Sequence, residues 1–87
     1  MRLQSSLDVA AASGLWSDLY LKRGAPIVLD ASEVERLGAA CLQVLLAAAA
    51  HWRRVGLEFR VVDPSPAFLE ALRIMGAQDA FRPAEAP

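Results

Sequence analysis

The chain has 87 residues, 55% of them hydrophobic and 22% charged, which is enough apolar material for one compact domain and too little chain for two. Nine Lys and Arg against ten Asp and Glu give a net charge of −1 without a basic stripe, so nucleic acid is not expected as a partner. The chain has one cysteine and no leader-like apolar stretch, and its longest apolar run is far shorter than the about 20 residues that a membrane span needs. We therefore expect a single cytoplasmic domain over residues 1–87.

The first part of the chain predicts a strand followed by a helix. The strand is expected at residues 2–5, where Leu3 is the residue best suited to face a core. Asp8 then precedes a helical pattern that Gly24 ends, because Asp is a good N-cap and Gly a good helix stop. The apolar face of this helix is expected to consist of Val9, Ala12, Trp16 and Leu19.

The middle of the chain predicts a buried strand and a long helix. Residues 26–30 form a short apolar run, typical of a central parallel strand buried on both faces. Residues 38–55 are rich in Ala and Leu and have the highest helix propensity in the chain. The face of this helix toward the sheet is expected to hold Cys41, Leu42, Leu45, Ala48, Ala49 and Trp52. The opposite, smooth face is expected to hold Ala40, Gln43, Ala47, Ala50 and Arg54.

The last part of the chain predicts another strand and another helix. Residues 57–62 are expected to form a strand at or near the sheet centre. Ser65 followed by Pro66 marks the start of a helix that Gly76 ends. Its buried stripe is expected to be Phe68, Leu69, Leu72 and Met75, and the tail is expected to pack through Phe81 and to fray from about residue 82. The whole is an α/β fold: a small, mostly parallel sheet with helices packed mainly on one side.

Catalytic chemistry finds little support in the residues. His51 lacks a Ser, Cys or Asp placed to form a nucleophile pair, so a plain surface or partly buried histidine is the favoured interpretation. Asp30 and Asp63 end strands at the edge where α/β sheets place their sites, yet no third metal ligand or glycine-rich phosphate loop accompanies them. Turn and capping roles are therefore favoured, partner contact is the alternative, and no cofactor, metal or enzymatic activity is expected.

Other residues leave two interpretations each. Cys41 is either buried on the apolar helix face, which is favoured, or a reactive thiol at a helix N-terminus. Ser65 is favoured as an N-cap over a phosphorylation site. Trp16 and Trp52 are favoured as core residues over interface anchors, because each falls on an apolar stripe. The smooth helix face around Ala47 is favoured as a docking surface, the alternative being a helix surface filled with good helix formers.

The order of three segments resembles that of the STAS family, the sulfate transporter and anti-sigma factor antagonist domains. These segments are VLDAS, the small-residue start of the Ala/Leu-rich helix, and FRVVDPSPAFLEALRIMGAQDAF, and together they cover about residues 26–81. Asp30 matches the Asp that ends the family's strand, and Leu42 matches the Leu of its helix-opening motif. The turn 64–66 matches the family's later turn of the type Asn-Pro-Ser.

The helix-opening motif departs from the family pattern Asp-Ser-Ser/Thr/Ala-Gly-Leu. Gly38 stands at the motif's Asp, Ala39 and Ala40 at its two small or hydroxyl positions, and Cys41 at its Gly. In phosphorylated members a partner kinase modifies the hydroxyl at the position of Ala40, which alters docking through charge and fit. Because alanine has no oxygen to modify, we predict that this switch is lost.

The resemblance implies a non-catalytic interaction module that docks on a regulatory kinase or an anti-sigma factor. Two alternatives stay open: an accessory subunit of a lipid-type ABC transporter, and a chemotaxis signalling accessory. The expected partner contacts are Asp30, Ser32, Gly38, Ala39, Ala40, Gln43 and Ala47. A homodimer also stays possible, whereas contact with nucleic acid and insertion into a membrane are not expected.

Overall fold

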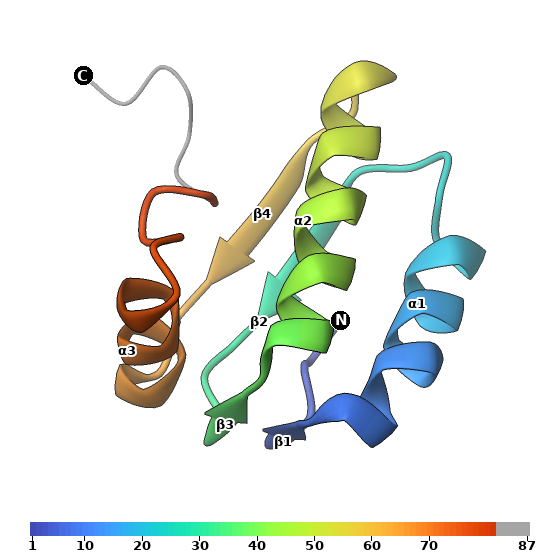
Figure 1. The fold of residues 1–87 in the computed structure, drawn as a ribbon. Coiled ribbons are helices and arrows are strands. Elements are labelled where there is room, and N and C mark those ends of the chain that lie inside the picture. The colour runs from blue at the N-terminus through green and yellow to red at the C-terminus, as the bar shows by residue number, and fades with distance from the viewer. Residues whose placement is uncertain (82–87) are drawn as a thin grey trace.

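The structure is a computed structural model that describes residues 1–81, so the predicted fraying from about residue 82 lies outside the described residues. Its elements follow the order β1 (Ser6–Leu7), a 3-10 helix η1 (Val9–Ala11), α1 (Ala12–Leu21), β2 (Ile27–Asp30), β3 (Arg36–Leu37), α2 (Ala39–Arg54), β4 (Phe59–Val62) and α3 (Pro66–Ile74) (Figure 1). The α/β fold predicted from the sequence is confirmed. None of the helices within residues 1–81 has the length and hydrophobicity needed to cross a bilayer.

Parallel strand pairs organise the centre of the fold. β2 pairs with β4 from Ile27↔Phe59 to Asp30↔Val62, and β1 pairs with β3 through Ser6↔Arg36 and Leu7↔Leu37. The free side of β2 binds the N-terminal residues: the Asp30 amide donates to the Met1 carbonyl (2.8 Å), and the Leu3 amide donates to the Asp30 carbonyl (2.9 Å). β2 is therefore central, as predicted.

The positions of two predicted strands are corrected. Instead of a strand at residues 2–5, Arg2 makes an isolated bridge to Asp30, and the strand β1 lies further along the chain. β4 pairs only with β2 among the described residues, so it lies at an edge rather than near the centre. Chain-local patterns show that a segment is extended, but the neighbour that it pairs with is decided by contacts far away in sequence.

The helices leave one face of the β2–β4 sheet open. Ile27 and Leu29 are buried, whereas Val28, which points to the other face, is 41% exposed. Figure 1 shows α2 lying across β2 and β4. The prediction of a strand buried on both faces is wrong, because only the side chains at alternate positions meet the helices.

The first helix differs from its prediction in its start and in its buried face. Asp8 caps the 3-10 turn η1, where its Oδ1 accepts from the Ala11 amide at 3.2 Å, and α1 begins only after it. Leu15 and Leu19 form the buried stripe of α1. Val9 and Trp16, which the spacing predicts on the apolar face, are both exposed. The spacing of Trp16 to Leu19 and that of Leu15 to Leu19 are equally helical, so periodicity alone does not choose between them.

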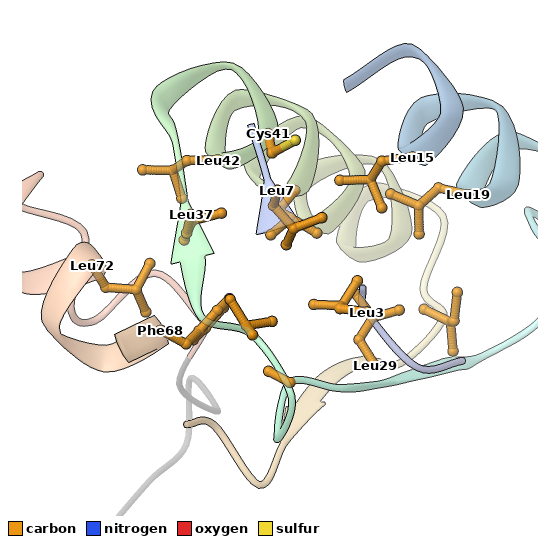
Figure 2. Packing of buried hydrophobic residues seen from close by; sticks show 14 of the residues in the cluster. Leu3, Leu7, Leu15, Leu19, Leu29, Leu37, Cys41, Leu42, Phe68 and Leu72 are labelled. Carbon is orange, nitrogen blue, oxygen red and sulfur yellow. The ribbon is translucent and has the colours of Figure 1, made fainter. Parts of the chain in front are cut away.

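The core lies between the helices and the strands. α2 buries Cys41, Leu42, Leu45, Ala49 and Trp52, as predicted, while Ala48 is half-buried. Figure 2 shows side chains from several elements converging, among them Leu3, Leu15, Leu29, Cys41 and Phe68. α3 adds Phe68 and Leu72, but Leu69 is exposed rather than buried. Phe81 packs beside Phe59 and Phe68, with ring centroids 6.1 and 6.3 Å apart, which confirms its predicted role.

Candidate docking surface

The N-terminus of α2 is built from small residues. Gly38 is its N-cap and has an extended backbone (φ −92°, ψ 170°) but no side chain to cap the helix. Its amide donates to the Leu7 carbonyl at 2.9 Å, and its carbonyl accepts from the Leu42 amide at 3.0 Å. Ala39 is exposed and Ala40 is half-buried. This end of the helix therefore presents backbone and methyl groups, with no hydroxyl in its first turn.

The loop after β2 is held by Asp30. Its Oδ1 accepts from the Ser32 amide at 2.8 Å, which is the turn role predicted for this carboxylate. Hydrogen bonding from Ser32 lowers the pKa of Asp30, and the nearby positive charges of Arg2 and the N-terminus lower it further. The Arg2 guanidinium lies 4.0 Å from Asp30 and 3.5 Å from Glu33. The loop lies at the same end of the molecule as the start of α2 (Figure 1).

Three other candidate residues have structural roles. Asp63 adopts a positive φ of 51° in the turn after β4. Ser65 is buried: its hydroxyl donates to the Val34 carbonyl and accepts from the Phe68 amide at 3.0 Å, so the predicted N-cap is confirmed. His51 is half-buried and meets the Trp52 ring edge-on, with centroids 5.7 Å apart. Residues 1–81 contain no group of three or more His, Cys, Asp or Glu arranged to hold a metal ion.

Cys41 lies inside the core rather than at an accessible helix start. Its side chain is fully buried, and its thiol donates to the Asp8 carbonyl at 3.2 Å. Burial raises the pKa of the thiol, and the negative charge of Asp8 raises it further. The favoured interpretation of Cys41, burial on the apolar face, is confirmed.

We expect Cys41 to be inert in the folded protein, because its thiolate is disfavoured and no reagent reaches it without opening of the core. The measurement is the rate of reaction with a chromogenic disulfide at pH 8, with and without denaturant. The rate should fall at least about 100-fold in the folded state, since only the small unfolded fraction reacts. Equal rates in both conditions would mean that α2 opens easily or that the thiol is accessible.

An apolar groove between α1 and α2 was missed by the sequence prediction. It has a volume of about 270 Å³ and is lined from α1 by Trp16, Leu19 and Tyr20 and from α2 by Val44, Ala47 and Ala48. The rings of Trp16 and Tyr20 stack, with centroids 4.9 Å apart and planes at 11°. Trp16 is 53% exposed, so the interpretation as an interface anchor, which the sequence disfavoured, fits its position.

Ala47 joins this groove to the predicted docking residues. Ala39, Gln43 and Ala47 are exposed and succeed one another at intervals of four, which places them along one line of α2. We call this line, together with Trp16 and Tyr20, the α1–α2 surface. Asp30 ends β2 and Ser32 follows in the loop after it, and neither residue belongs to the groove lining. That these residues contact a partner stays a prediction.

Fold and surface together define a small α/β module with an apolar groove between two of its helices. The chain belongs to the STAS domain family: the family described as "Mlab, STAS domain" matches residues 1–83. Domains of this family are generally non-catalytic regulatory or interaction modules. No curated protein gives a significant match to the chain. The resemblance seen in the sequence is thereby confirmed, whereas the correspondence of Ala40 to the phosphorylated position stays a prediction.

Proposed function

We propose that this chain is a cytoplasmic, non-catalytic docking module that binds its partner through the α1–α2 surface. The observation that carries the proposal is the exposed Trp16–Tyr20 stack beside the small side chains of α2. Exposed aromatic residues are costly to solvate and are enriched among the anchors of protein interfaces. Alanines such as Ala39 and Ala47 leave room for a partner backbone to approach α2 closely.

Binding is proposed to be constitutive with respect to phosphorylation at position 40. The first turn of α2, residues 39–42, reads Ala-Ala-Cys-Leu and contains no phosphorylatable hydroxyl. Regulation must then come from the partner or from another position. Phosphate mapped on the wild-type chain after incubation with a partner kinase would identify that other position, and a change in partner binding on its phosphorylation would contradict constitutive binding.

Two partner classes are supported by different observations. The matching family carries the name Mlab beside STAS domain, and the first candidate is an accessory subunit of a lipid-type ABC transporter that docks on its ATPase subunit. The order of the Asp30 strand, the α2 start and the Ser65 turn resembles that of anti-sigma factor antagonists, which keeps a regulatory kinase or anti-sigma factor as the second candidate. A chemotaxis partner rests on the same resemblance alone.

The test is capture of partners from native lysate with four forms of the protein: wild type, Gln43→Arg, Ala47→Glu and Ile74→Ala. Ile74 is an exposed apolar residue of α3 and serves as the control for loss of surface hydrophobicity. We expect the wild type and Ile74→Ala to retain one partner that Gln43→Arg and Ala47→Glu lose at least about 10-fold, the effect of a buried mismatched charge at an interface.

The identity of that partner separates the two candidates. An ABC-transporter ATPase supports the first, and a kinase or anti-sigma factor supports the second. Circular dichroism must show that all variants keep the helical content of the wild type. A partner retained equally by Gln43→Arg and Ala47→Glu would show that the docking face lies elsewhere on the molecule.

A further inference from the structure

The size and lining of the α1–α2 groove indicate what kind of group it receives. Its volume of about 270 Å³ lies just below the roughly 300–1,000 Å³ of pockets that enclose small molecules. Its walls are two helices, and its lining includes the apolar residues Trp16, Leu19, Val44 and Trp52. A groove of this shape suits a few apolar side chains of a third helix better than a whole cofactor.

One end of the groove is positively charged. Arg23 lines it, and its guanidinium is held 3.7 Å above the centre of the Tyr20 ring while donating to the Tyr20 carbonyl at 2.9 Å. Arg54 lies one turn beyond His51, which also lines the groove, and is exposed. No carboxylate belongs to the lining, and neither arginine forms an ion pair within residues 1–81.

We propose that the groove receives an amphipathic helix of the partner protein, with Asp or Glu at the end that meets Arg23. This inference rests on the proposed function. Apolar side chains spaced i, i+3 or i+4, and i+7 would lie against Trp16 and Val44. A guanidinium already held on Tyr20 loses little freedom on pairing with a carboxylate, so the acidic end sets the orientation of the helix. A second copy of this chain fits less well, because two such grooves facing each other bring no carboxylate to Arg23.

The test uses a displayed library of random 16-residue peptides selected on the full-length chain. We expect the enriched peptides to share apolar residues at helical spacing and acidic residues near one end. For the best synthetic peptide, Trp16→Ala and Arg23→Glu should each raise the Kd at least about 10-fold, while Arg60→Glu, on the open sheet face, should not change it. Raising the salt concentration from 50 to 500 mM should weaken peptide binding to the wild type. The Arg23→Glu variant should bind a peptide with Lys in place of Glu more tightly than it binds the original peptide.

Each contrary result has a distinct meaning. If Trp16→Ala weakens peptide binding but Arg23→Glu and salt do not change it, the proposed acidic end of the partner helix is wrong. The α1–α2 surface as a docking surface is then retained. If Trp16→Ala leaves the Kd of the selected peptides unchanged, or if the selection yields no binder, the groove is not a peptide site. Either result also counts against the α1–α2 surface as the docking surface. A dimer seen by analytical ultracentrifugation in the wild type and abolished in Trp16→Ala would assign the groove to a second copy and overturn the proposal.

Discussion

Replacing Trp52 with alanine should lower the free energy of unfolding by about 3–5 kcal/mol, the usual cost of removing a large buried aromatic side chain. Trp52 is only 3% exposed and packs against Phe59, with ring centroids 5.8 Å apart. Its indole Nε1 donates to the Ala25 carbonyl at 2.7 Å, which joins the end of α2 to the turn before β2. The substitution leaves a cavity and deprives the Ala25 carbonyl of its donor. Urea denaturation followed by circular dichroism measures the loss.

The matched control is Trp16→Ala, the same substitution at an exposed tryptophan. Trp16 rests on Tyr20 and contributes to the groove rather than to the core, so we expect a loss below about 1 kcal/mol, as for most surface substitutions. Partner binding should show the opposite order: under conditions where both variants are folded, Trp16→Ala should weaken binding more than Trp52→Ala does. Similar losses of stability at the two positions would contradict the assignment of one tryptophan to the core and the other to the surface.

Replacing Ser65 with alanine should cost about 2–4 kcal/mol, since one hydroxyl serves two elements. As the N-cap of α3 it accepts from the Phe68 amide, and loss of such a cap costs about 1 kcal/mol. It also donates to the Val34 carbonyl, and an unpaired buried acceptor costs a further 1–3 kcal/mol or so. The Ser65 amide, which alanine retains, donates to the Ala31 carbonyl at 3.1 Å. Chemical denaturation again gives the magnitude.

Two substitutions at the same position separate these contributions. Ser65→Thr keeps a hydroxyl that both donates and accepts, and should be the mildest change. Ser65→Asp keeps an acceptor for the Phe68 amide but cannot donate to the Val34 carbonyl, so it should be strongly destabilising in this buried place. A loss below about 0.5 kcal/mol for Ser65→Ala would show that water replaces the hydroxyl without penalty. The same burial makes Ser65 a poor phosphorylation site, because a kinase reaches its oxygen only after the start of α3 opens.

Local chemistry was sufficient to predict most of the helix ends, the start of α1 being the exception. Gly56 and Gly76 follow α2 and α3 with φ of 80° and 71°, a conformation that residues with a side chain rarely adopt. Ser65 and Pro66 start α3 for reasons that involve only their own backbone neighbours. The end of a helix is decided by the few amides or carbonyls next to it, so the amino acids there carry enough information.

The docking surface was predicted only in part for a related reason. The smooth line of Ala39, Gln43 and Ala47 on α2 is visible in the sequence, since a long helix with one strongly apolar face must expose the opposite one. In the aromatic half of the surface, the sequence pattern favours Trp16 as a core residue and predicts no role for Tyr20. Because α1 carries apolar residues around much of its circumference, its own sequence does not determine which of them pack against α2.

The sequence by itself therefore determined the order of the three helices with β2 and β4 between them, most helix ends, the inward face of α2 and the membership of the STAS family, whereas β3 and the position of β1 were not predicted. Only the tertiary structure decided that Trp16 is exposed while Trp52 is buried, that β4 lies at an edge, and that Cys41 is enclosed beside Asp8. The physical reason is the same in each case. Periodicity indicates which residues share a face of a helix or strand. Which face becomes buried depends on the segments, distant in sequence, that pack against it.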